Sequence, residues 1–223
     1  MRNNVISLLI FYFLFIPFQV YSKVTEVTIW VDGNYPPYSY EENGKIQGIY
    51  IDVMQRISQH MPDYHISFES EPWKRVKKEI EKGNVVAFAP LYYHGYDWPY
   101  VWPYSLPIME ESVISVCRND VLAKPRPNWP DDYIGFGRCS GLGYDGYGGK
   151  KFRQYVKNHK ITFIETKTVE QNIKMLLKGR VDCYMISRLT YAWVMKKIKK
   201  SNVYSQSKYQ LVEGATISTD DVY

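Results

Sequence analysis

The sequence predicts an α/β protein of two lobes, each a mostly parallel sheet flanked by helices. Short apolar runs rich in β-branched and aromatic residues alternate with amphipathic stretches, as in right-handed βαβ units. This series occurs twice, before and after an aromatic-rich segment at 92–107. Without its N-terminal segment the chain has about 200 residues, which suits either one large domain or two small α/β lobes. We predict a first lobe at 23–113, a second at 114–212 and a strand at 213–223 that returns to the first.

Residues 1–22 have the pattern of a secretory signal peptide. Arg2 precedes an apolar run from Val5 to Phe18, and Val20-Tyr21-Ser22 offers tolerated side chains for cleavage after Ser22. The run has about 14 residues, whereas a bilayer span needs roughly 20. We therefore predict cleavage after Ser22 and a soluble mature protein exported to the periplasm.

The first lobe is predicted to begin with a strand at Glu26–Val31, because its residues favour extended structure. Pro36-Pro37 ends the sheet in an exposed aromatic turn, and Gly44 supplies positive φ in the turn that follows. Asp52 is placed to cap a helix. Apolar residues recur at helical spacing in this helix, at Val53, Ile57 and Met61.

A second βαβ series completes this lobe. Tyr64–Glu69 alternates as a strand, and Glu71-Pro72-Trp73 opens a helix that ends at Gly83. Val85–Leu91 is a continuous apolar run typical of a buried parallel strand. Beyond the aromatic segment, Glu111–Arg118 is the next predicted strand.

The second lobe is predicted to repeat this organisation. Thr168 and Gln171 have the spacing of a capping box at the start of a helix. The expected elements are a strand at 132–136, a glycine-rich loop at 141–149, a helix at 150–157, a strand at 161–165, a helix from 168 to about 179, a strand at 181–186, a helix through 200 and return strands at 209–212 and 215–217.

The cysteines and histidines do not indicate a metal site. Three cysteines in an oxidising compartment permit one bridge and leave at least one thiol free. Cys139 is predicted to follow a strand and Cys183 to begin a parallel neighbour, at a different height, so we expect no disulfide. The histidines are scattered, and no pair of His or Cys has ligand spacing.

The net charge of +5 is mild, and its basic residues gather near the end of a predicted helix at Lys196–Lys200. A short lysine run of this kind is typical of a solvated helix face. We therefore expect no nucleic-acid partner.

Gly141–Gly146 fits the G-x-G-x-x-G pattern of dinucleotide-binding loops, with Glu165 at the end of the next strand. An exported protein rarely meets dinucleotides, however, and Arg138-Cys139-Ser140 separates the strand from the glycines. A loop at a cleft accounts for the glycines more simply, and we expect no cofactor.

Four segments form a recognisable series. The first is Tyr35–Ile57, YPPYSYEENGKIQGIYIDVMQRI, and the others are Glu71–Arg75 with Gly83, Tyr104–Pro107 and Lys178–Asp182. In this order they resemble four elements of the bacterial extracellular solute-binding proteins of family 3, the polar-amino-acid-binding group. Those elements are the Tyr-Pro-Pro loop with its Asp-capped helix, the Pro-Trp-x-Arg helix, the Phe-Ser-x-Pro element and the Gly-Arg-Val-Asp strand start. The resemblance covers the chain from Thr25 to about Val222.

This resemblance implies a type II periplasmic-binding-protein fold that holds a small molecule between its lobes. It implies an inner-membrane ABC permease or a sensor as the partner, and we expect a monomer. Members continue past the return strand with a further strand and terminal helices. Because this chain stops at Tyr223, we expect a fragment or a shortened member with an incomplete first lobe.

The resemblance also locates the ligand clamps. In amino-acid-binding members, an Arg about six residues before the Phe-Ser-x-Pro element grips the ligand carboxylate. An Asp five residues after the Asp of Gly-Arg-Val-Asp pairs the ligand ammonium. Here those positions are Trp98 and Ser187. Because desolvated charges need partners, a standard amino acid is not expected as the ligand.

Aromatic residues stand in place of the clamps, and flat rings suit apolar, cyclic or cationic ligands. The alternative for each ring is packing within the core or on a lobe surface. Arg138 and Ser140 are candidates to hold an anionic group near a helix N-terminus, with a surface ion pair as the alternative for Arg138. The predicted ligand-binding residues are Tyr38, Trp73, Tyr92, Trp98, Arg138, Ser140 and Ser187.

We therefore predict an exported solute-binding protein that carries out no catalysis and serves an ABC-type transporter. One alternative is a cyclohexadienyl dehydratase-like enzyme on the same fold. Its candidate acids are Glu110, Glu111 and Glu165, for each of which an exposed surface role is expected. The other alternative is a periplasmic sensory or accessory module.

Overall fold

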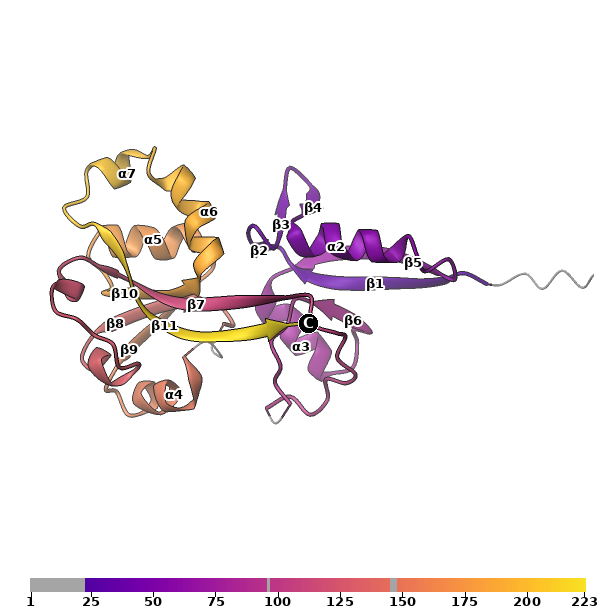
Figure 1. Ribbon diagram of the computed structural model, residues 1–223, viewed down its shortest axis with the longest axis horizontal. Helices are drawn as coiled ribbons and strands as arrows, with labels where there is room; N and C mark the ends of the chain where they lie inside the picture. Colours follow the sequence, from indigo (N-terminus) through magenta and orange to yellow (C-terminus); the bar gives the residue numbers. More distant parts are fainter. Residues whose placement is uncertain (1–22, 96, 145–147) are drawn as a thin grey trace, which may run out of the picture.

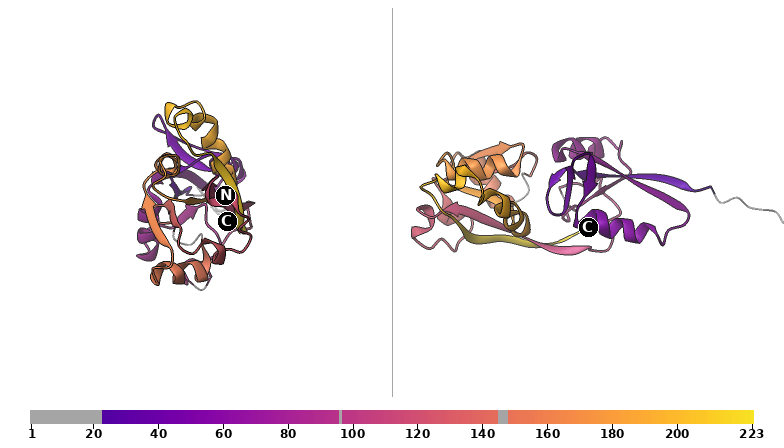
Figure 2. Two further views of the ribbon diagram at one scale, coloured as in Figure 1. Left: turned by 90° about the vertical axis from the view of Figure 1, so that its left-hand side faces the viewer. Right: turned by 90° about the horizontal axis from the view of Figure 1, so that it is seen from above.

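The computed structural model describes residues 23–95, 97–144 and 148–223, so the predicted signal peptide lies outside the described residues. Two α/β lobes lie end to end along the long axis of the molecule (Figure 1). The antiparallel strands β7 (Met109–Arg118) and β11 (Leu211–Val222) run from one lobe to the other. The view from above shows the same two crossing strands (Figure 2). The predicted two-lobed α/β class is confirmed.

The first lobe is built on a three-stranded parallel sheet in the order β5-β1-β6, beside a small antiparallel sheet β2-β3-β4. Its strands are β1 (Thr25–Asp32), β2 (Asn34–Tyr35), β3 (Ser39–Glu42), β4 (Lys45–Gln47), β5 (Tyr64–Glu71) and β6 (Ala87–Ala89), and its helices are α2 (Ile49–Ser58) and α3 (Trp73–Glu81).

The second lobe is built on a five-stranded sheet in the order β11-β7-β10-β8-β9. Strands β8, β9 and β10 are parallel, and β7 is antiparallel to its two neighbours. Besides β7 and β11, its elements are β8 (Gly137–Gly141), α4 (Gly149–Lys157), β9 (Thr162–Thr166), α5 (Val169–Leu177), β10 (Cys183–Ser187), α6 (Arg188–Ile198), α7 (Asn202–Ser205) and the 3-10 turns Val121–Ala123 and Asp131–Tyr133.

Helix α2 starts earlier than predicted, because Gly48 and not Asp52 is its N-cap. Gly48 has φ +132°, and a Cβ there would lie 2.3 Å from the carbonyl oxygen of Tyr38, so only glycine fits. Asp52 instead lies in the first turn, where its charge complements the helix dipole. The predicted apolar face is also wrong, since Tyr50 and Ile51 are buried while Ile57 is 51% exposed.

The predicted boundaries of α3 and α5 are confirmed. Pro72 is the N-cap of α3, and Gly83 adopts φ +74° just beyond the end of that helix. Thr168 Oγ1 accepts a hydrogen bond from the Gln171 amide at 3.2 Å, so the expected cap opens α5.

The predicted strand at 132–136 is wrong, since the segment forms a 3-10 turn and the strand starts at Gly137. The Asp132 carboxylate accepts a hydrogen bond from the Asn128 amide at 2.8 Å, and Gly135 has φ +85°. These local contacts compete with strand pairing, and Tyr133 is buried by packing against Cys117, Val121 and Cys183.

The expectation of no disulfide is also wrong. Cys117 and Cys183 form a disulfide between β7 and β10, because the two antiparallel strands place these residues directly opposite each other. The height difference between Cys139 and Cys183 does not bear on this pair, because Cys117 lies on β7, the other neighbour of β10. Cys139 lies within β8 and keeps a free, buried thiol.

The buried apolar residues divide between the lobes. The largest cluster lies in the second lobe, where α5 and α6 pack against the sheet through residues such as Ile173, Leu176 and Ile186. In the first lobe, Tyr38 and Tyr50 cluster with Val222, so the return strand packs beside the inner end of that lobe. No helix within the described residues is long and apolar enough to cross a membrane.

Candidate functional site

Two cavities, of about 710 and 600 Å³, lie between the lobes. Both are lined by Asp32, Tyr35, Trp73 and Tyr144, so these four residues mark the junction of the cavities. Asp32 ends β1, and Tyr144 belongs to the glycine-rich loop after β8. The site therefore lies where strands of both lobes end, as is usual for ligand sites in α/β proteins.

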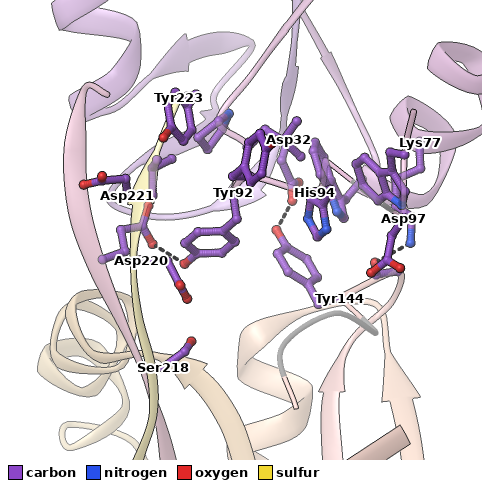
Figure 3. A pocket seen from close by; sticks show the side chains of 18 of the residues that line it. Asp32, Lys77, Tyr92, His94, Asp97, Tyr144, Ser218, Asp220, Asp221 and Tyr223 are labelled. Carbon is purple, nitrogen blue, oxygen red and sulfur yellow. Dashed lines mark hydrogen bonds between the residues drawn. The ribbon is translucent and has the colours of Figure 1, made fainter. Parts of the chain in front are cut away.

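The first cavity is bordered by the aromatic segment after β6 and by the end of the return strand. Figure 3 shows Ser218, Asp220 and Asp221 along β11 on one side, and Lys77 and Asp97 on the other. The second cavity is bordered by the start of α3 and by the ends of β8 and β10.

Several contacts bridge the lobes across this cleft. Asn34 Nδ2 donates to the carbonyl oxygen of Lys167 at 2.8 Å, and Lys77 Nζ donates to the carbonyl oxygen of Gly143 at 3.1 Å. The hydroxyls of Tyr38 and Ser187 hydrogen-bond at 3.0 Å. The lobes are therefore closed on each other at the cavities.

The Asp32 carboxylate is buried at the junction of the cavities. The Tyr144 hydroxyl donates to its Oδ2 (Figure 3), and the backbone N–H of Asn34 donates to its Oδ1 at 2.8 Å. Loss of water raises the pKa of Asp32 to about 6, against the lowering effect of these two hydrogen bonds. The carboxyl group is thus poised to gain or lose a proton near neutral pH.

A second buried carboxylate, Glu111 of β7, faces a group of tyrosines. It is 2% exposed and accepts hydrogen bonds from the hydroxyls of Tyr35, Tyr50 (2.6 Å) and Tyr92 (3.0 Å). Burial raises its pKa, and the tyrosine hydrogen bonds oppose the rise. The expected surface role of Glu111 is therefore wrong.

Aromatic rings form one wall of the first cavity. The ring centroid of Trp73 is 6.4 Å from that of Trp98 and 6.3 Å from that of Tyr144. His94 stacks on Trp98 at 4.2 Å, and Lys77 Nζ lies 5.3 Å from the centroid of the Trp98 ring. One cation–π contact therefore already exists in this wall.

The structure brings most of the sequence-predicted site residues to the cleft. Trp73 lines both cavities, Tyr92 and Trp98 line the first, and Ser187 lines the second. Tyr38 reaches the cleft through its hydrogen bond to Ser187 and is itself buried.

Arg138 and Ser140 lie elsewhere, which corrects the placement expected for them. Both are in β8, both are fully buried, and neither is among the described residues that line the two cavities. The Arg138 guanidinium lies 4.2 Å from the ring centroids of Trp129 and Tyr133, and its Nη1 donates to Ser115 Oγ at 3.0 Å. Arg138 is thus part of the packing of the second lobe.

Sequence reasoning missed Asp32, Tyr144 and the burial of Glu111. A signal existed for Asp32, because it follows a predicted strand at the edge where ligands bind. The glycine-rich loop was identified, but Tyr144 within it was not; residues 145–147 of that loop lie outside the described residues. No group of three or more His, Cys, Asp or Glu with metal-binding geometry occurs in the described parts of the chain.

Comparison with known families identifies one relation. Residues 27–93 match the family model described as bacterial extracellular solute-binding proteins, family 3. This match covers most of the first lobe and confirms the resemblance found in the sequence motifs. No curated protein sequence matches the chain.

Solved structures share the fold over most of the chain. A histidine kinase sensor domain with similarity to periplasmic binding proteins has a TM-score of 0.72 at 16% identity, over 90% of this chain and 81% of its own. The arginine-bound form of truncated ArgBP from T. maritima has a TM-score of 0.65 at 16% identity, over 89% and 85%. An arginine third transport system periplasmic binding protein from Legionella pneumophila has a TM-score of 0.63 at 17% identity, over 89% and 85%. At these identities the comparison shows a two-lobed periplasmic-binding-protein fold.

Proposed function

We propose that this chain is an exported solute-binding protein that closes its two lobes around a small molecule other than a standard amino acid. The family match of the first lobe and the shared fold of the whole chain support a ligand-binding role. The observation that carries the proposal is the cleft, whose two cavities are lined by residues of both lobes and bridged by hydrogen bonds between them. A ligand that contacts both lobes would favour this closed arrangement.

The lining of the cleft argues against an amino-acid zwitterion. Trp98 and Ser187, the residues at the two clamp positions, both line the cavities and carry no charge. The basic residues of the first cavity, Lys77 and Arg153, already contact the Gly143 carbonyl and the Asp97 carboxylate. A ligand carboxylate would therefore have to share a basic group that already has a partner, which compensates its desolvation less well than a dedicated clamp.

The proposed partner is an inner-membrane ABC-type permease, with a membrane sensor as the other possibility. The two kinds of structural neighbour correspond to these partners, since one is a transport-system binding protein and another is a kinase sensor domain. In either case the protein would act as a monomer in the periplasm and present its closed form to the partner.

A second candidate is an enzyme of the dehydratase type on the same fold. The observation in its favour is the Asp32 carboxyl in the cleft, whose pKa of about 6 suits general acid–base chemistry at neutral pH. Conversion of prephenate or arogenate by the mature protein, abolished by Asp32→Asn, would establish this activity. Absence of conversion by a protein that binds ligands leaves binding as the function.

Thermal unfolding with a ligand library tests the proposal. The mature protein should show a raised Tm with at least one member of a set of amino acids, amines, sugars and aromatic acids, because a ligand that binds the folded state stabilises it. Trp73→Ala removes a ring shared by both cavities and should abolish the shift. Trp102→Ala is the matched control, because Trp102 is 80% exposed and lies outside both linings. A complete absence of shifts would contradict a solute-binding role.

A further inference from the structure

The charged residues of the first cavity are mostly acidic. Five of its lining residues are acidic and two, Lys77 and Arg153, are basic. Arg153 Nη2 lies 3.7 Å from a carboxylate oxygen of Asp97, so this pair is neutral overall. The four remaining acidic residues are Asp32, Glu111, Asp220 and Asp221. Asp220 lies opposite Glu111 on β7 and shares its face of the sheet, whereas the side chain of Asp221 leaves the other face.

Lys77 offsets only one of these acidic residues, so the lining keeps a surplus of negative charge. Lys77 is held by the Gly143 carbonyl and by the face of Trp98. The second cavity is acidic as well, since its lining includes Asp32, Glu41 and Glu71 but only Lys167 as a basic residue. Of these, Glu71 pairs with Arg75 at 2.9 Å. A cleft lined mostly by charges of one sign attracts ligands of the opposite charge and disfavours ligands of the same charge.

The junction of the cavities combines a buried carboxylate with aromatic faces. Asp32 is 3% exposed, and its two hydrogen-bond partners, the Tyr144 hydroxyl and the Asn34 amide, are neutral. The ring centroids of Tyr35 and Tyr144 lie 5.7 Å apart, and Trp73 completes the group. A carboxylate beside aromatic rings is a favourable environment for an ammonium group.

The second cavity offers an apolar chamber beyond this junction. Its lining includes Pro72, Leu142, Val169, Met185 and Ile186. Thr190 is also among the lining residues; it is fully buried, and its hydroxyl has no hydrogen-bond partner among the described residues.

We propose that the cleft takes an organic cation with an apolar body and no carboxylate. Its ammonium group lies beside Asp32 and the rings of Trp73 and Tyr144, and its body extends into the apolar second cavity. This inference rests on the proposed function and names the ligand class of the same site.

Four probes that share a phenylethyl framework test the proposal by calorimetry on the mature protein. They are phenethylamine, the neutral 2-phenylethanol, the anionic 3-phenylpropionate and zwitterionic phenylalanine. We expect phenethylamine to bind at least ten-fold more tightly than 2-phenylethanol and about a hundred-fold more tightly than the two carboxylates. Equal or tighter binding of any of the other three would overturn the inference.

Charge-removing variants test the role of the carboxylates. Asp32→Asn keeps the shape of the side chain and should weaken phenethylamine binding about ten-fold, with little effect on 2-phenylethanol. Asp220→Asn combined with Asp221→Asn changes two exposed positions of β11, where folding is not at risk, and should weaken phenethylamine several-fold. The control Asp52→Asn, an exposed residue of α2 outside both linings, should leave both affinities unchanged. Phenethylamine affinity that is unchanged in both cavity variants would contradict the proposal.

The ligand library separates this inference from the proposed function. If the amine does not bind and the compounds that raise the Tm are neutral or anionic, the ligand class is wrong and the binding function stands. If the only compounds that raise the Tm are carboxylate-free cations, both stand. If no compound binds, the binding function itself fails.

Discussion

Asp32 shows how desolvation outweighs hydrogen bonding at a single residue. Its carboxylate has two donors, Tyr144 and Asn34, yet burial prevails and raises its pKa. The burial of Glu111 acts in the same direction, despite three tyrosine donors. Such carboxylates lower the stability of the unliganded protein at neutral pH, and a cation bound beside them would relieve this cost.

This arrangement predicts that Asp32 makes stability depend on pH. Its folded-state pKa of about 6 lies above the ordinary 3.8, so the folded protein holds the proton more tightly. The stabilisation from protonation is fully present below the ordinary pKa and is lost as pH rises through about 6. Urea unfolding of the mature protein should show that, from pH 7 to pH 5, the free energy of unfolding of the wild type rises by about 1 kcal/mol relative to that of Asp32→Asn.

The exposed Asp52→Asn variant serves as the control for this experiment, and its difference from the wild type should be the same at both pH values. If the free energy of unfolding of the wild type does not rise relative to that of Asp32→Asn at the lower pH, the carboxyl group is not desolvated as described.

The same residues explain where sequence reasoning ended. Tyr144, the partner of Asp32 from the other lobe, lies 112 positions along the chain, and the nearest tyrosine that donates to Glu111 lies 19 positions away and outside β7. Side-chain periodicity does not encode such contacts, because they depend on how the two lobes meet. Tyr38 and Trp98 could be predicted only because the family resemblance places them at ligand contacts.

At the scale of elements, local signals predicted the helices well and the strand starts less well. Pro72, Gly83 and Thr168 act within one turn of the helix ends they define, so their effects were visible in the sequence. Helix α2 starts earlier than predicted because Gly48 lies close to the Tyr38 carbonyl. Helix propensities carry no information about such a contact. The segment before β8 was mispredicted because side-chain hydrogen bonds competed with strand pairing.

The disulfide between β7 and β10 gives a prediction at this scale. It joins Cys117 and Cys183, which are 66 residues apart, and therefore restricts the unfolded chain. Replacing both with alanine should lower the free energy of unfolding by roughly 2–4 kcal/mol. Thiol titration of the denatured, unreduced protein should find the single free thiol of Cys139, and Cys139→Ala should remove it. Three reactive thiols before reduction would contradict the pairing.

At the scale of the whole molecule, two crossing strands hold lobes that otherwise meet through side chains at the cleft. β7 and β11 pair over most of their length. The end of β11 is anchored in the first lobe, where Val222 packs against Tyr38 and Tyr50. Strand–helix alternation predicted the two lobes because it reflects each lobe's own connectivity. The cavity lining could not be predicted, because it draws side chains from segments between Asp32 and Tyr223.

The central claim is that this chain keeps the two-lobed binding fold without the charged clamps for an amino-acid zwitterion. Trp98 and Ser187, which the family resemblance predicts to stand at the clamp positions, line the cleft, and the basic residues of the first cavity contact other groups. Two lost charge-assisted contacts of roughly 1.5–3 kcal/mol each correspond to about two to four decades of affinity.

The most direct measurement is titration calorimetry of the mature protein with the standard amino acids, above all glutamine, arginine, histidine and glutamate. We expect every dissociation constant to be weaker than about 1 mM, which corresponds to about −4 kcal/mol of binding free energy. Micromolar binding of any one of them would contradict the account, because it would require a clamp for the zwitterion that the described cleft does not provide.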